Sequence, residues 1–209
     1  MKKAFLNALR VAREFRRAYI LSNLICYGLF ICGAIAMALV PTAMKQSMIQ
    51  QLGVFLTKGT YAPVTDAYRS GFILLAILLT FVVNLIIGRF LSITLPSVII
   101  PFSGILMYVP VPFIMGLVVS LALGTRTITD INLLILAALE LQSSIIAILG
   151  AYIQGKALLF PKSVGVVTHQ QGFWFGIKQS LYLYILIVIV LAIAALHESF
   201  LFFVVLPMR

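Results

Sequence analysis

The sequence predicts an all-α, polytopic helical membrane bundle, and its composition carries that prediction. Hydrophobic residues make up 63% of the 209-residue chain and charged residues only 10%, against roughly 25% charged in soluble globular proteins. The mean hydropathy is +1.16. A soluble fold of this length has too small an interior to hide so much apolar surface. The composition therefore excludes disordered, coiled-coil, disulfide-scaffold and cytosolic-enzyme classes.

The few charges are strongly biased toward basic residues. The chain has 15 Lys and Arg but only 5 Asp and Glu, which gives a formal net charge of +10. Because the basic residues lie between apolar runs, we expect them to set the membrane orientation and to meet anionic lipid headgroups. Membrane lipids, and no nucleic acid, are the expected contacts.

Residues 1–18 predict a cytoplasmic amphipathic helix and form the first of two expected segments. Apolar side chains recur at helical spacing, at Phe5, Ala8, Leu9, Ala12 and Phe15. Such a helix can lie in the headgroup plane; the alternative is a docking helix for a cytoplasmic partner. The expected headgroup contacts are Lys2, Lys3, Arg10, Arg13, Arg16 and Arg17.

Residues 19–209 are expected to form a single helical membrane domain. Tyr19–Val40 is an uncharged run of 22 residues, about 33 Å as a helix and long enough to span. Ala36-Met37-Ala38 resembles a signal-peptidase site, but the run exceeds the usual signal-peptide length and favours a retained span. Pro41 ends it. Residues 42–70 then read as a polar loop with a surface helix over residues 43–57.

The next two spans meet at a single charge in the sequence. Gly71–Gly88 predicts the second span, closed by Arg89. Residues 90–124 then run for 35 residues without a charge and contain four prolines. Such a run is long for one crossing and short for two, and prolines interrupt helices. We expect either a proline-broken third span or a hairpin.

The carboxyl-terminal half predicts two further spans. They cover residues 131–155 and 179–196, with a loop over 156–178 and an apolar tail over 200–206. In that loop, Trp174 between two phenylalanines predicts either an interface anchor or a docking surface.

The distribution of basic residues favours five spans over six. Five spans put ten basic residues on the amino-terminal side and five on the other, whereas six spans give nine and six. Since basic residues concentrate in cytoplasmic loops, we expect five spans with a cytoplasmic amino terminus. The expected location is the prokaryotic cytoplasmic (inner) membrane.

Glu140 is the strongest candidate site residue, because it lies near the middle of the span over residues 131–155. An acidic side chain there costs roughly 2.5–3.5 kcal/mol on insertion scales and normally faces protein or water. Small and polar residues share its helix face: Ala137, Ser143, Ser144, Ala147, Ala151 and Gln154. The opposite face, with Leu134, Leu141, Ile145 and Leu149, is either a lipid or a core face.

Two interpretations of Glu140 stay open. It either forms part of a transport path or proton site, or serves as a buried hydrogen-bonding group that joins helices. Asn84, with Thr80 one turn before it and Gly88 one turn after it, is the expected partner. His197 and Glu198 are expected to be an interfacial, hydrated pair.

Motif matches to enzymes and metal sites are incomplete. Gly150–Lys156 fits the opening of a P-loop, but Ala157 replaces the Ser or Thr and the segment continues an apolar helix. His197-Glu198 lacks the second histidine of a zincin site, because Leu201 takes its place. We therefore expect no enzyme activity, no cofactor and no metal site.

The segment Ala138–Leu158, ALELQSSIIAILGAYIQGKAL, and the tail ALHESF resemble the stage II sporulation protein M family of small prokaryotic membrane proteins. The positions that match are Glu140, Ala147, Gly155, Glu198 and Phe200, with Asn84 a weaker match. The chain departs from that family where a His-Gly pair often precedes the acidic residue and a Pro-Ala pair follows it.

The resemblance implies a membrane scaffold or permease-like subunit of an export or envelope-organising complex, often beside a separate ABC-type ATPase, as in circular bacteriocin systems. A homo- or hetero-oligomer is then expected. The alternative from the residues is a stand-alone transporter of a peptide or lipid that uses the polar face around Glu140. An intramembrane enzyme is a third, weaker alternative.

Overall fold

The computed structural model describes residues 2–58, 62–124 and 127–205, and every regular element in them is helical. The elements in chain order are α1 (Lys2–Glu14), α2 (Arg16–Ala38), α3 (Thr42–Lys58), α4 (Ala62–Arg69), α5 (Ile73–Val83), π-helical η1 (Asn84–Thr94), α6 (Leu95–Ile99), α7 (Ser103–Tyr108), α8 (Pro110–Ala122), α9 (Thr127–Leu159), 3₁₀ η2 (Pro161–Val164), α10 (His169–Phe200) and π-helical η3 (Leu201–Val205).

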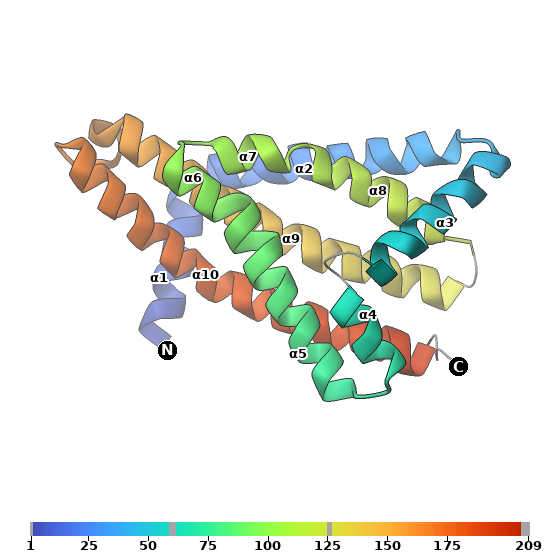
Figure 1. Cartoon of the computed structure of the whole chain (residues 1–209). Helices are drawn as coiled ribbons and strands as arrows, with labels where there is room; N and C mark the ends of the chain where they lie inside the picture. Colours follow the sequence, from blue (N-terminus) through green and yellow to red (C-terminus); the bar gives the residue numbers. More distant parts are fainter. Residues whose placement is uncertain (1, 59–61, 125–126, 206–209) are drawn as a thin grey trace.

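Within the described residues, five helices are long and apolar enough to cross a membrane. They are Arg16–Ala38, Ile73–Ile99, Ser103–Ala122, Thr127–Leu159 and His169–Phe203. Figure 1 shows them as an elongated bundle, with α1 and the α9–α10 turn toward one end and α3 toward the other. The expected all-helical bundle is confirmed at this level.

The amino-terminal segment forms an amphipathic helix, as expected, but it packs on the protein itself. α1 lies against α10, and its buried side chains are Ala8 and Val11, followed by Phe15 at the α1–α2 junction. All six basic residues expected at the headgroups are exposed on α1 and the first turn of α2. α2 begins at Arg16, so the first span starts earlier than expected.

The expected polar loop over residues 42–70 is largely helical. α3 (Thr42–Lys58) lies within a residue of the expected surface helix, and α4 (Ala62–Arg69) adds an unexpected second one. α4 packs on α5 through Val64, Ala67 and Tyr68. α3 has no buried side chain among those described.

The second span does not end at Arg89. Its helix runs from Ile73 to Ile99, so Arg89 lies inside the span and is only 5% exposed. The separation into spans 71–88 and 90–124 is therefore wrong. A single charged residue leaves no chain for a turn between antiparallel helices, whose connections need a few residues.

The turn between the second and third spans lies at residues 100–102 instead. Phe102 adopts a left-handed backbone with φ of 67°, which is costly for a residue other than glycine. The third span is Ser103–Ala122, and Val109, directly before Pro110, keeps helical backbone angles. Pro101 of the long apolar run therefore lies in the turn between two spans, and Pro110 lies within the third span.

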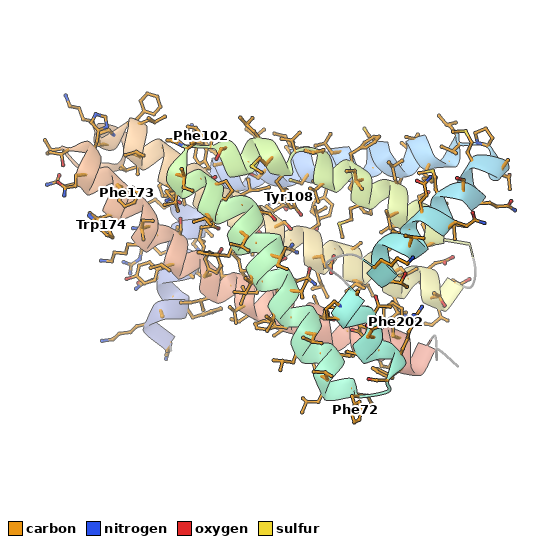
Figure 2. All side chains as sticks on the ribbon, in the orientation of Figure 1. Phe72, Phe102, Tyr108, Phe173, Trp174 and Phe202 are labelled. Atoms are coloured by element: carbon orange, nitrogen blue, oxygen red, sulfur yellow. The ribbon has the colours of Figure 1, made fainter. Side chains whose placement is uncertain are left out.

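The last two spans form a long antiparallel pair. The helices extend well into the expected loop over residues 156–178, which shrinks to residues 160–168 because α9 ends at Leu159 and α10 begins at His169. Thr168 caps α10 by accepting from the Gln171 backbone N–H, and the Gln171 side chain accepts from the Thr168 N–H in return. Figure 2 shows Phe173 and Trp174 on α10 near this turn.

α9 is the central helix of the bundle. It packs against α10, α2, η1, α7 and α8. On one face of α9, Leu141, Ile145 and Leu149 are each exposed by 1% or less. The sequence allowed either a lipid face or a core face here, and the structure shows a core face. Leu134, nearer the start of the helix, is exposed at 44%.

Glycines let the helices approach at backbone contact. A Cβ on Gly33 of α2 would lie 2.0 Å from the Phe113 carbonyl oxygen of α8, and one on Gly116 would lie 2.0 Å from the Phe30 carbonyl oxygen. The two helices therefore fit reciprocally. Since apolar attraction between helices is weak in lipid, this close approach is a main source of their packing energy.

We expect Gly33→Ala to destabilise the bundle, because its methyl group would collide with backbone that cannot rotate away. Overpacking of this kind costs about 1–3 kcal/mol, which lowers the thermal midpoint by roughly 2–12 °C for a chain of this size. Thermal unfolding in mild detergent, followed by circular dichroism, measures the effect. Gly28→Ala on the same helix is the control, because nothing lies within 4 Å of its added Cβ; equal midpoints for the two variants would contradict the packing argument.

Candidate functional site

Glu140 and Arg89 come together in the interior of the bundle. The Arg89 Nε donates to Ser143 Oγ at 2.8 Å, and Nη2 donates to the backbone carbonyl of Glu140 at 2.9 Å. The guanidinium therefore binds across the η1–α9 interface with two of its donors. The sequence placed Arg89 at the end of the second span and therefore did not predict this contact.

The Glu140 carbonyl is the point at which these hydrogen bonds converge. Besides Arg89, it accepts from Ser143 Oγ at 2.7 Å and from Ser144 Oγ at 3.0 Å. Tyr108 on α7 extends the network by donating to Ser144 Oγ at 2.6 Å. One backbone atom of α9 thus connects three helical segments, and we call Asn84, Arg89, Tyr108, Glu140, Ser143 and Ser144 the Arg89 cluster.

Asn84 lies where the sequence placed it, beside the Glu140 side chain. Its Nδ2 donates to Glu140 Oε1 at 3.4 Å, and the residue is 9% exposed. Asn84 and Arg89 are the first and sixth residues of the π-helical segment η1. Pro96 follows two residues after that segment, and a proline removes a backbone donor and crowds the preceding turn. Widened turns of this kind often occur at functional sites.

Thr80 does not join the Arg89 cluster. It lies against the Tyr68 hydroxyl at 3.2 Å, and the same hydroxyl lies 3.3 Å from Ser199 Oγ at the end of α10. Burial raises the pKa of Tyr68 to about 12, so its hydroxyl keeps its proton across the physiological range. We call Tyr68, Thr80, Glu198 and Ser199 the Tyr68 cluster.

His197 and Glu198, at the end of the last span, match the expected interfacial, hydrated pair only in part. The Glu198 carboxyl lies near the Tyr68 hydroxyl and is half-buried rather than open to water. His197 Nε2 lies 3.0 Å from the Asn132 carbonyl of α9. Phe200 is 48% exposed and belongs to neither cluster.

The remaining residues of the α9 stripe are packing positions. Ala147 is buried, and Gly155 packs against the ring of Phe102, to which an added Cβ would come within 2.6 Å. Gln154 is 1% exposed, and both its amide atoms lack a partner in the described structure. Its backbone lies against Gly176 of α10.

Sequence reasoning missed Arg89 and both tyrosines. For Arg89, the sequence held one indication against a loop, because no turn residues follow it. A clear turn signature occurs instead at Pro101-Phe102-Ser103-Gly104. Tyr68 and Tyr108 lay in segments assigned to a loop and to a broken helix. Nothing in their local pattern predicts which partner they meet.

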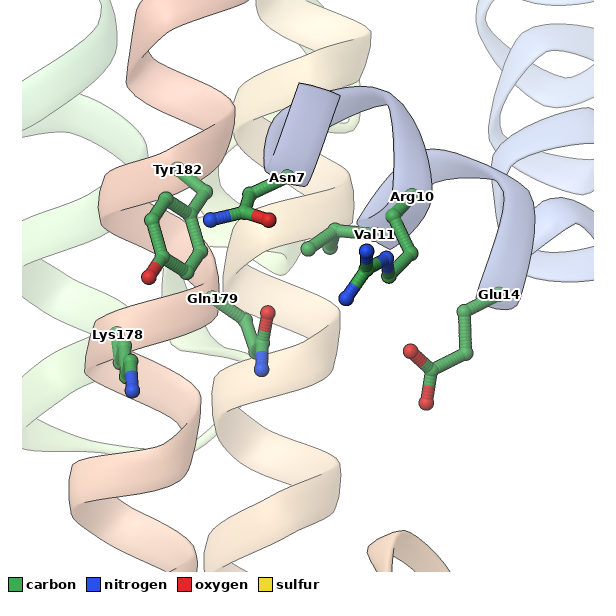
Figure 3. Close-up of a pocket in the computed structure, with 7 residues that line it drawn as sticks. All are labelled: Asn7, Arg10, Val11, Glu14, Lys178, Gln179 and Tyr182. Atoms are coloured by element: carbon green, nitrogen blue, oxygen red, sulfur yellow. The ribbon is translucent and has the colours of Figure 1, made fainter. Parts of the chain in front are cut away.

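A polar hollow of about 250–280 Å³ lies on each side of Glu14, at the end of the bundle near α1. Figure 3 shows the one between α1 and α10, with Arg10, Gln179 and Tyr182 among its lining residues. The other lies between the α1–α2 junction and α9. Neither Arg89 nor Glu140 lines either hollow.

Within the described residues, no three His, Cys, Asp or Glu side chains are grouped so that they could hold a metal ion. Comparison with protein-family models, with curated proteins and with solved structures finds no match to this chain. The site combines a fixed guanidinium, a neighbouring carboxyl group and a set of hydroxyl groups that join helices.

We expect Ser143→Ala to destabilise the bundle by about 1–3 kcal/mol, because it leaves the buried Arg89 Nε–H without its acceptor. The thermal midpoint in mild detergent should fall by roughly 2–12 °C. Ser120→Ala is the matched control, since Ser120 is half-buried on α8 and outside both clusters. An equal midpoint for the two variants would show that the Arg89 contact contributes no stability.

Proposed function

We propose that the chain is a non-enzymatic integral membrane subunit that acts as a scaffold or permease-like component of an export or envelope-organising complex. The observation that carries the proposal is the hydrogen bonding of the Arg89 cluster. Its guanidinium bonds to a backbone carbonyl and a serine of the neighbouring helix, and it lines neither of the hollows beside Glu14. Such a cluster suits a charge that joins helices rather than one that carries a substrate.

The outer surface gives further support. α3 leaves Met44, Ile49 and Val54 more than half exposed, and its main packing neighbour is α4. A surface helix with exposed apolar side chains beside five spans is suited to contact a second copy or another membrane protein. In our proposal, α3 provides that interface.

The resemblance to the stage II sporulation protein M family fits the same role. Its matched residues Glu140, Ala147 and Gly155 follow one stripe of the central helix α9. We further propose that the chain lies in the cytoplasmic membrane of a prokaryote, with its amino terminus in the cytoplasm. It forms an oligomer, and a separate ATPase supplies the energy for export.

Nine basic residues of α1, α2, η2 and the α9–α10 pair support this orientation. They are Lys2, Lys3, Arg10, Arg13, Arg16, Arg17, Lys156, Lys162 and Lys178.

The opposite end has Lys45, Lys58 and Arg69 on α3 and α4. Arg126 and Arg209, which the sequence count placed on that side, lie outside the described residues, as do Met1 and Leu206. Moving Arg89 from a loop into a span removes one basic residue from the amino-terminal side and leaves the bias intact.

The test is whether the chain forms a defined complex through α3. Chemical crosslinking in intact membranes, followed by native mass spectrometry in mild detergent, should give a fixed stoichiometry of copies or subunits. Ile49→Lys should abolish that complex and leave the thermal midpoint unchanged, because Ile49 is 53% exposed. Val167→Lys is the lysine control for exposure alone, because Val167 is 76% exposed and lies between α9 and α10, outside the spans.

A strictly monomeric protein without a bound subunit, in membranes and in mild detergent, would contradict the scaffold proposal. Survival of the complex in Ile49→Lys would place the interface elsewhere than on α3, and its loss in both lysine variants would show that the lysine acts without regard to position.

The second candidate is a stand-alone transporter of a peptide or lipid, favoured by the presence of two ionisable side chains, Arg89 and Glu140, within the spans. Purified protein in liposomes should then move a fluorescent peptide or lipid across the bilayer. Glu140→Gln should stop that flux while the helical content and thermal midpoint stay near those of the parent. Absence of flux in the parent protein would exclude this role.

A further inference from the structure

The hollow between the α1–α2 junction and α9 has an unusual lining. It has a volume of about 250 Å³ and is lined by Glu14, Phe15, Arg16, Arg17, Ala18, Tyr152 and Lys156. Three of these residues are cationic and one is anionic, so the lining carries a formal charge of +2. The sequence assigned Arg16 and Arg17 to headgroups in general but placed Lys156 in a separate loop, so it gave no reason to connect them.

Lys156 is held at this hollow by aromatic rings rather than by a carboxylate. Its Nζ lies 5.7 Å from the centre of the Phe15 ring and 5.9 Å from that of Tyr152, within the range of cation–π attraction. These two ring contacts position the ammonium group without neutralising it. The lysine therefore stays available to an anion.

Two arginines line the same hollow. Arg16 and Arg17 form the first turn of α2 and are exposed. No side chain caps this helix end. Arginine side chains suit phosphate in particular because their donors form a planar fork.

We propose that this hollow binds the phosphate of one anionic phospholipid, with Lys156, Arg16 and Arg17 as its ligands. A lipid is favoured over a soluble phosphate because the hollow lies where two membrane spans, α2 and α9, approach their ends. The acyl chains can continue along the apolar surfaces of those helices while the phosphate stays among the cations. The inference is independent of a scaffold or transport role.

The hollow on the other side of Glu14 is a weaker candidate for the same lipid. Its lining in Figure 3 includes two cations, Arg10 and Lys178, on different helices and without an aromatic clamp. The remaining polar residues there are Glu14, the amides Asn7 and Gln179, and Tyr182, so the lining carries a formal charge of +1. We therefore place the phosphate site beside Lys156.

The experiment titrates purified full-length protein in nonionic detergent with phosphatidylglycerol and with phosphatidylcholine, and counts bound lipid by native mass spectrometry. The parent should bind one phosphatidylglycerol in preference to phosphatidylcholine. Lys156→Gln should weaken that binding about fivefold, and the triple change Arg16→Gln, Arg17→Gln, Lys156→Gln roughly 100-fold, at about 1 kcal/mol per cation. Lys156→Arg should largely restore binding.

The control changes Lys2, Lys3 and Arg13 to Gln, which removes the same charge from the same end of the bundle but away from the hollow. It should bind phosphatidylglycerol within about twofold of the parent. Equal losses in the two triple variants would overturn the site in favour of general surface attraction. If the triple variant loses helical content, Lys156→Gln alone decides: binding equal to that of the parent overturns the proposal.

A second arm distinguishes the source of the phosphate. Glycerol 3-phosphate and inorganic phosphate are added at millimolar concentration to the protein–phosphatidylglycerol complex. The lipid should stay bound, because its acyl chains add apolar contact that the soluble anions lack. Displacement by either soluble phosphate at these concentrations would overturn the lipid assignment.

Discussion

The arrangement of this bundle depends on one constraint: hydrocarbon provides no hydrogen bonds to a guanidinium. Arg89 lies inside a span and is 5% exposed, so protein atoms must supply its acceptors. They come from Ser143 and the Glu140 carbonyl on the central helix. A helix that must deliver its arginine to two fixed acceptors has little freedom to rotate or slide against α9. Interactions of this type define register as much as they add stability.

Close packing and polar contacts support each other in this structure. Ser180 Oγ reaches the Gly150 carbonyl at 3.0 Å, and a Cβ on Gly172 would lie only 1.9 Å from the Ala157 carbonyl oxygen. The glycines bring backbones together, and a serine hydroxyl can then reach across to the neighbouring helix. Near the middle of α9 the same logic applies to Tyr108 and Ser144. Small residues and hydroxyls are therefore parts of one packing mechanism, as expected in lipid.

Features that follow from composition and periodicity could be predicted from the sequence. Contacts that depend on how far apart two helices lie could not. Five spans and the Asn84–Glu140 pair followed from apolar runs and from one acidic residue on a small, polar stripe. Arg89 was misplaced because a charge flanked by apolar residues is consistent with both a loop and a buried cation. The choice between them depends on whether another helix provides a hydrogen-bond acceptor for the guanidinium. Here the acceptor is Ser143, which is 54 residues away in the sequence. The Tyr68–Ser199 contact, across 131 residues, has no local signal at all.

The two ends of the bundle differ in a way that bears on function. The end near α1 concentrates exposed basic residues around a short loop, and its amphipathic helix already packs on α10. That end combines cations with exposed apolar side chains such as Phe160 and Trp174, a combination that suits the headgroup region of a membrane. The opposite end has α3, whose apolar side chains are exposed and whose main neighbour is the short α4. Because α1 already packs on α10, the protein partner that we propose is better accommodated beside α3 than beside α1.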